Sequence, residues 1–433
     1  MKAKDKPRII NIMPHEPAYH FSPDKKPDLF WEKPDGGFLG FWTREWPDLL
    51  GEEVLKQSDK YDWEVWQPDY RTDKVYSKKI ETGVTHHLFP AEKKSYKTGI
   101  KSKNGFFSEK MISRLNNLKN DPMILTFHAT YGLYVPFFKK ILELFGPGKN
   151  FPVFLLGHGM FKSPLSEMLG LHRPLNYLDI IIEHLCQKKL LKHIDVISEQ
   201  AESALREVKR IYNGRTEKLT MGCDFDYWIP VPSPDIKMSI RQRLNIPQDK
   251  MVFLITGNFQ PRKQSAKLLE IFGRIADRDD FFLNITGHGD ETNTKLIDSL
   301  AAPLLQQNKA LLHSYVSVEE LRNIYWASDI YISVATDEGG PVSVMKAMAC
   351  GLPVLSTPVG ETVERMKQFG AGKFIPVKNY YEWRTVILEI LDKELPNTLD
   401  REIAKEAYDW PNVAKRFIHV FDDLIFQYYG IRH

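Results

Sequence analysis

Residues 337–354 read DEGGPVSVMKAMACGLPV. The order is a charged turn, a glycine pair, an apolar helix-forming run and a short apolar strand. A glycine loop that opens a helix presents backbone N–H groups and the positive end of the helix dipole, which together receive phosphate or pyrophosphate. Glu338 precedes the glycines and would repel a phosphate, so we expect it to bind a neutral, hydroxyl-rich group, such as a sugar, beside the phosphate.

Around this segment, short apolar runs alternate with longer amphipathic ones, which is the pattern of parallel sheets covered by helices. The C-terminal half predicts strands at residues 251–256, 282–286, 310–313, 330–334 and 353–356, with helices that include 264–276 and 318–326. The N-terminal half predicts strands at 8–13, 63–66, 123–127, 151–156 and 194–198, and helices at 109–118, 136–144 and 199–212. The pattern therefore occurs twice and favours an α/β protein with two doubly wound domains.

A proline cluster, PVPSP at residues 230–234, is expected to link the domains, because neither a helix nor a central strand tolerates it. We predict a first domain over 1–230, a second over 231–412, and an amphipathic, aromatic helix over 413–433 that packs back on the first domain. Ligands of open α/β sheets bind beyond the carboxyl ends of the strands, so we expect the site in a cleft between the two domains.

Composition narrows the function classes. Hydrophobic residues make up 42% and charged residues 27%, as in soluble globular proteins, and a net charge of only +3 does not favour nucleic acid as a partner. The apolar runs are shorter than the ~20 residues that a membrane-spanning helix needs. The first residues lack the apolar stretch of a secretory signal, and Cys186, Cys223 and Cys350 have no metal-ligand spacing. We therefore expect a cytoplasmic protein with packing cysteines.

Four segments together resemble a known family. They are GNFQPRK at 257–263, TGHG at 286–289, DIYIS at 329–333 and the run at 338–359. Their order and spacing resemble those of the retaining GT-B glycosyltransferases of family 4, and the resemblance extends from Gly36 to the final helix. It implies two Rossmann-like domains that face each other across a cleft. It also implies transfer, with retention, of a sugar from a nucleotide-sugar donor to a hydroxyl acceptor, which is a glycan, a lipid-linked acceptor or a protein. Cell-surface polysaccharide, glycolipid or glycoprotein synthesis would be the setting.

The resemblance also implies a donor site at the opening segment. Glu338 would be a catalytic-site carboxylate that holds sugar hydroxyls, and the residues after it would place backbone against the pyrophosphate or the sugar: Gly339, Gly340, Pro341 and Val342. Pro341 donates no hydrogen bond and would instead fix the first helical turn. The alternative is an ordinary glycine turn before a core helix.

This chain departs from the family pattern at three positions. Lys346 stands where the family usually has a glutamate that binds the donor ribose, and an ammonium cannot accept those hydrogen bonds. Lys346 would therefore pair with a nearby carboxylate or phosphate, or the donor would be held differently. Asn258 takes the place of an arginine beside the donor pyrophosphate. Glu361 stands where the family often has a second glycine.

Two cations follow Asn258 in the same loop. Lys263 matches the family's lysine that reaches the pyrophosphate, and the adjacent Arg262 is a candidate to replace the missing arginine. A solvated Arg-Lys loop is the alternative interpretation.

The first domain contributes two further candidates. His158 lies between two glycines after an apolar run, FLLGHGM at 154–160, and resembles the family's active-site histidine that contacts the donor sugar. A histidine at a strand end with a merely structural role is the alternative. Gly37 belongs to a glycine pair that resembles the family's loop near the donor phosphate.

Residues 92–110 are basic and aromatic, with six lysines and two glutamates. Such a segment, from Lys93 to Lys110, can lie on an anionic membrane surface, and a solvated loop is the equal alternative. The segment DFD at 224–226 has the spacing of a metal-binding pair but falls near the domain link, so we expect no metal and no cofactor besides the nucleotide-sugar substrate.

A different class of function is also compatible with these residues. Asn258 and Lys346 could mark a non-catalytic, nucleotide-sugar-binding partner of another transferase with the same fold. A GT-B sugar epimerase is a third hypothesis.

Overall fold

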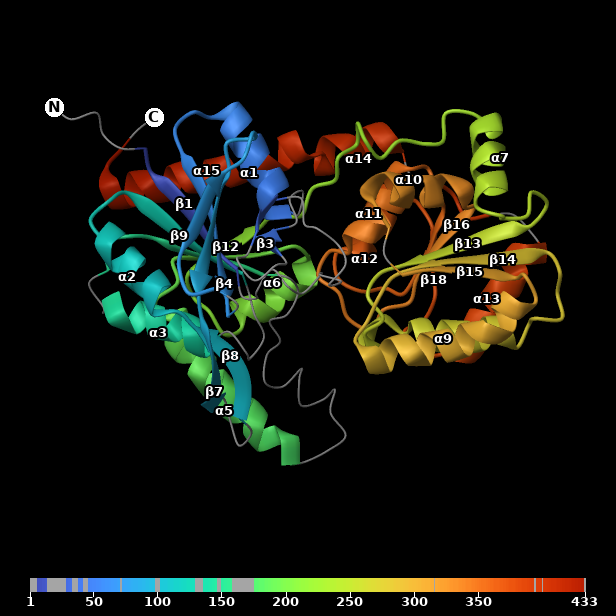
Figure 1. Cartoon of the computed structure of the whole chain (residues 1–433), viewed down its shortest axis with the longest axis horizontal. Coiled ribbons are helices and arrows are strands. Elements are labelled where there is room, and N and C mark those ends of the chain that lie inside the picture. Colours follow the sequence, from blue (N-terminus) through green and yellow to red (C-terminus); the bar gives the residue numbers. More distant parts are fainter. Residues whose placement is uncertain are drawn as a thin grey trace. The chain divides into compact units, whose positions relative to one another are not determined.

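The structure, a computed structural model, describes residues 6–13, 29–32, 38–41, 46–70, 72–97, 102–128, 135–145, 149–157, 175–314, 316–392, 395–398 and 400–431. The chain forms two compact units (Figure 1). Unit 1 comprises Met1–Thr220 and Trp410–His433, and unit 2 comprises Met221–Asp409. Each unit is built on its own largely or wholly parallel sheet, so the expected α/β architecture with two Rossmann-like domains is confirmed.

Unit 1 contains an eight-stranded sheet in the order β12-β11-β10-β9-β1-β4-β6-β5. All its neighbours pair parallel except β5 with β6. The strands are β1 (Arg8–Ile12), β4 (Asp62–Asp69), β5 (Tyr76–Lys79), β6 (Thr85–Pro90), β9 (Met123–His128), β10 (Val153–Leu156), β11 (Val196–Glu199) and β12 (Arg215–Lys218). Two hairpins accompany it, β2 (Leu29–Glu32) with β3 (Phe38–Phe41), and β7 (Glu92–Lys97) with β8 (Ser102–Phe107).

Five helices and the C-terminal helix belong to unit 1 among its described residues. They are α1 (Trp46–Gln57), α2 (Glu109–Leu118), α3 (Val135–Phe145), α5 (Leu175–Leu191), α6 (Glu202–Lys209) and α15 (Trp410–Tyr429). Helix α15 runs beside α1 (Figure 1), and its Phe421 meets the rings of Tyr61, Trp63 and Phe154. The C-terminal helix therefore packs on the first domain as predicted, although it begins at Trp410 rather than at residue 413.

Unit 2 contains a six-stranded parallel sheet in the order β15-β14-β13-β16-β17-β18. The strands are β13 (Met251–Thr256), β14 (Phe281–Thr286), β15 (Ala310–His313), β16 (Ile330–Ser333), β17 (Val354–Ser356) and β18 (Lys373–Phe374). The order reverses between β14 and β16 around β13, which is the topological switch at which ligands of such sheets bind.

The helices of unit 2 connect these strands. They are α7 (Pro234–Arg243), α8 (Ser265–Gly273), α9 (Glu291–Gln306), α10 (Val318–Ala327), α11 (Val342–Ala349), α12 (Thr362–Phe369), α13 (Tyr380–Asp392) and α14 (Arg401–Tyr408), with a 3-10 turn η2 (Pro261–Lys263) before α8. Apolar faces of α8, α9 and α13 enclose one core with β13 and β14, while α11 lies in a second core that includes Trp228 and Tyr325.

The boundary between the units differs from the expected linker. The chain enters unit 2 at Met221, before the proline cluster, because Cys223, Phe225 and Trp228 are buried in the unit 2 core. The cluster instead starts helix α7. The Ser233 side chain accepts a hydrogen bond from the backbone of Ile236, and a proline occupies the first turn.

No helix in the described part of the chain is both long and apolar enough to cross a membrane.

Candidate functional site

The loops at the carboxyl ends of β13, β14 and β15 are bonded to one another. The Phe259 N–H donates to the carbonyl of His288 (2.7 Å), and the Gly287 N–H donates to the carbonyl of His313 (3.0 Å). A Cβ atom at position 287 would lie 1.9 Å from the Gly257 carbonyl oxygen, so only glycine permits this approach. The GNFQPRK and TGHG segments, which the family resemblance rests on, therefore form one continuous edge.

Gln264 anchors the cationic end of the first loop. Its backbone has a φ of +54°, an uncommon value for a residue with a side chain, and its side chain is almost fully buried. The Gln264 amide donates to the carbonyl of Val334 (2.6 Å) and its oxygen accepts from the Tyr380 hydroxyl (3.0 Å). The Thr336 N–H also donates to the carbonyl of Arg262 (2.8 Å), so the loop after β13 is tied to the loop after β16.

Glu338 meets both cations of that loop. Lys263 Nζ lies 2.6 Å from Glu338 Oε1, and the Arg262 guanidinium bonds the same oxygen. Arg262 also donates to the carbonyl of Asp337 (3.0 Å). The Glu338 side chain is 11% exposed, against 19% for Lys263 and 37% for Arg262. The structure thus brings together three of the predicted site residues, two cations and one carboxylate.

The glycine loop, residues 338–341, leads directly into α11. Pro341 is the residue before the helix, and no side chain caps the helix start, so the backbone N–H groups of the first turn have no intrahelical partners. The hydroxyl of Tyr325, on α10, donates to the carbonyl of Ser343 in the first turn of α11 (3.1 Å). Burial raises the pKa of Tyr325 well above its ordinary value, which keeps this donor neutral. Gly339, Gly340, Pro341 and Val342 therefore lie where an anion could approach helix amides.

Lys346 lies further along α11. Its Nζ is 4.6 Å from the centre of the Trp228 ring, a cation–π contact. Burial lowers the pKa of Lys346, and only the thiols of Cys223 and Cys350 act in the opposite direction. Those thiols are themselves neutral, since burial raises the pKa of Cys223 to about 12. Among the described residues, no carboxylate forms an ion pair with Lys346, so the predicted carboxylate partner is not found there.

Asn258 lies in the loop between Gly257 and the two cations. Its Oδ1 is buried and has no hydrogen-bond partner in the described part of the chain. The remaining candidates, His158 and Gly37, lie outside the described residues, and their predicted roles stay predictions.

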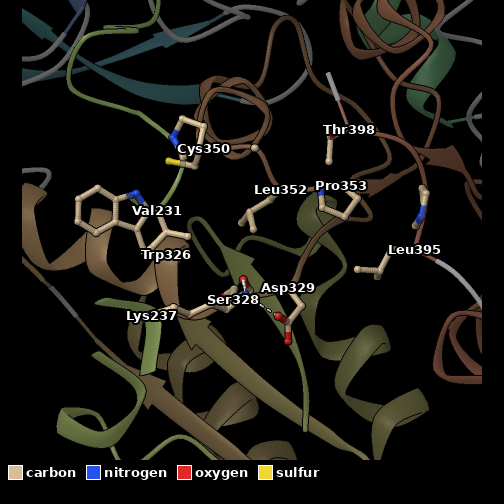
Figure 2. A pocket seen from close by; sticks show the side chains of 13 residues that line it. Val231, Lys237, Trp326, Ser328, Asp329, Cys350, Leu352, Pro353, Leu395 and Thr398 are labelled. Atoms are coloured by element: carbon tan, nitrogen blue, oxygen red, sulfur yellow. Dashed lines mark hydrogen bonds and ion pairs between the residues drawn. The ribbon is translucent and has the colours of Figure 1, made fainter. Parts of the chain in front are cut away.

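A separate cavity of about 310 Å³ lies at the other end of the unit 2 sheet (Figure 2). It is lined by Asp329 and Pro353, which precede β16 and β17, whereas Glu338 follows the carboxyl end of β16. The Asp329 carboxylate is held by Lys237 and Arg241, each at 2.6 Å. Because the cavity lies at the amino ends of β16 and β17, and ligands of such sheets bind beyond the carboxyl ends, we distinguish it from the predicted donor pocket.

Comparison with known proteins supports the resemblance. The model of the family described as Glycosyl transferases group 1 matches residues 237–410. A glycosyltransferase of Methanocaldococcus jannaschii, described as uncharacterized, is 24% identical over 220 residues, which cover 50% of this chain and 54% of that protein. A D-inositol 3-phosphate glycosyltransferase of Thermobispora bispora is 24% identical over 264 residues, covering 56% and 59%. The chain thus spans about half the length of the curated relatives it matches.

Solved structures support the fold over nearly the whole chain. Sucrose-phosphate synthase from Thermosynechococcus elongatus superposes with a TM-score of 0.73 at 15% identity, covering 98% of this chain and 100% of that one. The E. coli trehalose-6-phosphate structure bound with UDP-2-fluoro glucose gives 0.68 at 11% identity, covering 96% and 99%. These likenesses confirm the GT-B architecture expected from the sequence.

The family match covers the loops that carry Lys263 and Glu338, together with helix α11. Residues 237–410, which form most of unit 2, match the model of the group 1 glycosyltransferases.

Proposed function

We propose that this protein is a retaining, metal-independent glycosyltransferase that moves a sugar from a nucleotide sugar to a hydroxyl acceptor. The observation that carries the proposal is the meeting of Lys263 and Glu338, 2.6 Å apart, beside the uncapped start of α11. A cation, the first amides of a helix and a hydrogen-bond acceptor therefore lie together at the carboxyl ends of neighbouring strands. A sugar diphosphate needs all three.

The chemistry follows from where charge develops. When the bond between the sugar and the diphosphate breaks, negative charge accumulates on the departing phosphate oxygen. Lys263, Arg262 and the amides after Gly340 would stabilise that charge without reorganising, which is the most effective form of electrostatic catalysis. No metal is then required. Glu338 would hold sugar hydroxyls, and His158 would orient the sugar at the reacting carbon.

Glu338 has a second role in this scheme. Its carboxylate pairs with both Lys263 and Arg262 and offsets one of their two positive charges. A bound diphosphate would take over part of that pairing and leave the carboxylate oxygens to accept from sugar hydroxyls. The cation pair would thus bind the phosphate part of the donor, and Glu338 would select for the sugar part.

The names of related proteins agree with this donor class. Among structures of similar fold, Anabaena HepE has been solved in complex with UDP, with UDP and glucose, and with UDP-glucose, and Arabidopsis Starch Synthase IV has been solved bound to ADP and acarbose. Several curated relatives are D-inositol 3-phosphate glycosyltransferases, whose name indicates a polyol hydroxyl as acceptor. We extend to this chain a nucleoside diphosphate sugar as donor and a hydroxyl as acceptor.

The second candidate is a non-catalytic protein that binds a nucleotide sugar for a partner transferase. It is favoured by Asn258 and Lys346, which replace residues that the family uses to hold the donor. Turnover separates the two candidates, because only the transferase releases nucleoside diphosphate from a nucleotide sugar when acceptor is present.

We expect Glu338→Gln and Lys263→Met to have different effects on nucleoside diphosphate binding and on sugar transfer. Lys263→Met should weaken binding of a nucleoside diphosphate and lower kcat by on the order of 10²–10³-fold, the usual loss for one charge-stabilising group. Glu338→Gln should lower transfer from the nucleotide sugar while leaving nucleoside diphosphate binding unchanged or tighter, since it frees the two cations. Calorimetric titration and product release with a panel of nucleotide sugars, in EDTA, measure both.

The matched control is Lys267→Met, which removes an exposed α8 lysine paired with Glu270 at 3.0 Å and should change neither quantity. Equal loss of both activities in the two site variants, with loss of folding, would mean that the Glu338 cluster is structural. Full activity that appears only on addition of a divalent metal would contradict the metal-independent mechanism.

Lys346→Met should change the free energy of unfolding, and this change can be measured separately from donor binding. Because the pKa of Lys346 is lowered in the folded protein, the unfolded chain binds more protons between the folded-state pKa and the ordinary value of 10.5, so stability rises with pH across that window. The variant should therefore be more stable than the wild type at neutral pH, and the difference should shrink as the pH approaches 10.5. Denaturant unfolding at several pH values measures it.

If the Lys346 ammonium contacts the donor, Lys346→Met should bind the nucleotide sugar more weakly although it is more stable. Lys295→Met, which removes an exposed lysine of α9, serves as the control and should alter neither stability nor binding. A stabilised Lys346→Met protein with unchanged donor KM would show that the ammonium takes no part in donor recognition.

We also propose that the β7–β8 hairpin contacts an anionic membrane surface. Lys93 and Lys94 are exposed on β7, and their ammonium groups lie 4.0 Å from the rings of Tyr70 and Phe107. Each cation contributes about 1 kcal/mol near such a surface, so Lys93→Ala with Lys94→Ala should weaken binding roughly 30-fold.

Co-sedimentation with phosphatidylcholine vesicles that contain phosphatidylserine measures this binding, at low and high salt. The control replaces Lys78 and Lys79, a second exposed lysine pair on β5. Binding that is insensitive to salt, or equally reduced in both double variants, would contradict a specific role for the hairpin.

A further inference from the structure

The glycine loop is held from behind by the first turn of α12. The Glu361 N–H donates to the carbonyl of Gly339 (2.7 Å). Arg365 Nη1 donates to the carbonyl of Pro341 (3.2 Å). Two carbonyls of one four-residue loop are therefore fixed by two residues that lie one helical turn apart.

These two residues also form an ion pair inside unit 2. Arg365 Nη2 lies 2.6 Å from Glu361 Oε2, and the side chains are 0% and 1% exposed. A buried pair of this kind adds little net stability over an apolar pair of the same volume, because both charges must be taken out of water. Its presence needs another explanation, and the bond to the Pro341 carbonyl supplies one. A guanidinium can bond the carboxylate and the carbonyl at the same time, whereas an apolar side chain can bond neither.

The turn just before α12 approaches the loop as closely as backbone allows. Gly360 has a φ of +51°, and a Cβ atom there would lie 2.1 Å from the carbonyl oxygen of Glu338 and 2.2 Å from that of Gly339. Only glycine is possible at such a contact. Displacement of α12 would consequently move the backbone of the residue that pairs with Lys263.

Tyr408 completes the buried cluster. The Arg365 guanidinium lies 4.8 Å from the centre of the Tyr408 ring. Burial, with a contribution from the Glu361 charge, raises the pKa of Tyr408 to about 12, so its hydroxyl stays protonated. The Tyr408 carbonyl accepts from the Cys223 N–H (2.8 Å), which connects the first residues of unit 2 with its last ones.

We infer that Arg365 is a positioning residue for the glycine loop, and that with Glu361 it holds the loop in the conformation in which Glu338 meets Lys263. This role accounts for Glu361, which stands where the family that the sequence resembles often has a glycine. Its consequence for donor binding rests on the proposed function, but its consequence for the loop does not.

The test uses the double variant Glu361→Gln with Arg365→Met. Removing one partner alone would leave a buried charge without its ion-pair partner and could unfold the protein, whereas the double change removes both charges and conserves volume. It also removes the donor to the Pro341 carbonyl. The matched control is Glu291→Gln with Lys295→Met, an ion pair with the same i,i+4 spacing on the exposed surface of α9.

Two measurements are made on wild type, double variant and control. Hydrogen exchange of the amides at 338–340 and 342–344 reports the loop without any ligand. The inference predicts exchange at least tenfold faster in the double variant and unchanged in the control. Donor and acceptor KM report function, with an expected tenfold rise of the donor KM alone. Arg365→Lys, which retains the charge but not the forked geometry, should give an intermediate value for both.

Unchanged exchange at these amides in a folded double variant would overturn the inference, since the pair would then only fill the core. A wild type that binds no nucleotide sugar would instead overturn the proposed function, and the exchange result would still decide the role of Arg365. Faster exchange throughout unit 2, to the same extent as in the glycine loop, would also contradict a positioning role.

Discussion

The carboxylate of Glu338, shared between Lys263 and Arg262, is the interaction on which the site depends. Two cations and one carboxylate leave one net positive charge within this triad, in which Glu338 is the least exposed member and Arg262 the most exposed. The triad ties the end of β13 to the end of β16, two strands that are neighbours in the sheet. If an anion binds here, Lys263 and Arg262 exchange part of their pairing with Glu338 for pairing with the anion.

The supporting residues make this exchange possible by keeping the backbone still. Gln264 fixes the cationic loop through the Val334 carbonyl, and the Glu361–Arg365 pair fixes the glycine loop through two further carbonyls. The Gln264 and Arg365 side chains are buried and donate to backbone carbonyls, whereas Glu361 bonds the loop through its own N–H and bonds Arg365 through its carboxylate. Buried polar groups are costly unless they are hydrogen-bonded. The backbone of the site is thus held by buried hydrogen bonds, while the ion-pair partners of Lys263 and Arg262 can be replaced by a ligand.

Much of the frame could be predicted from the sequence. The strands at 251–256 and 310–313 and the helix at 109–118 have the predicted bounds, because each is an apolar or amphipathic run between clear turn signals. The family resemblance assigns Lys263 and Glu338 to one donor site, but their ion pair is found only in the structure. In contrast, β7 reads EKKSYK and has no apolar alternation, so only its partner β8 makes it a strand. The proline cluster has the composition of a linker, but its Ser-Pro pair is equally a helix start and begins α7.

The rest of the site could not be predicted because it depends on contacts distant in sequence. Gln264 and Val334 are seventy residues apart, and nothing in the local pattern near Glu361 indicates that its N–H meets Gly339. The sequence alone marks Lys346 as a departure from the family pattern, but its contact with Trp228 is formed only by the fold. A crystal structure of the protein with the nucleoside diphosphate that binds most tightly among UDP, GDP and ADP tests the central claim most directly. We predict its diphosphate within hydrogen-bond distance of Lys263 Nζ and of the first amides of α11. A diphosphate bound elsewhere, with the Lys263–Glu338 pair intact, would contradict the account.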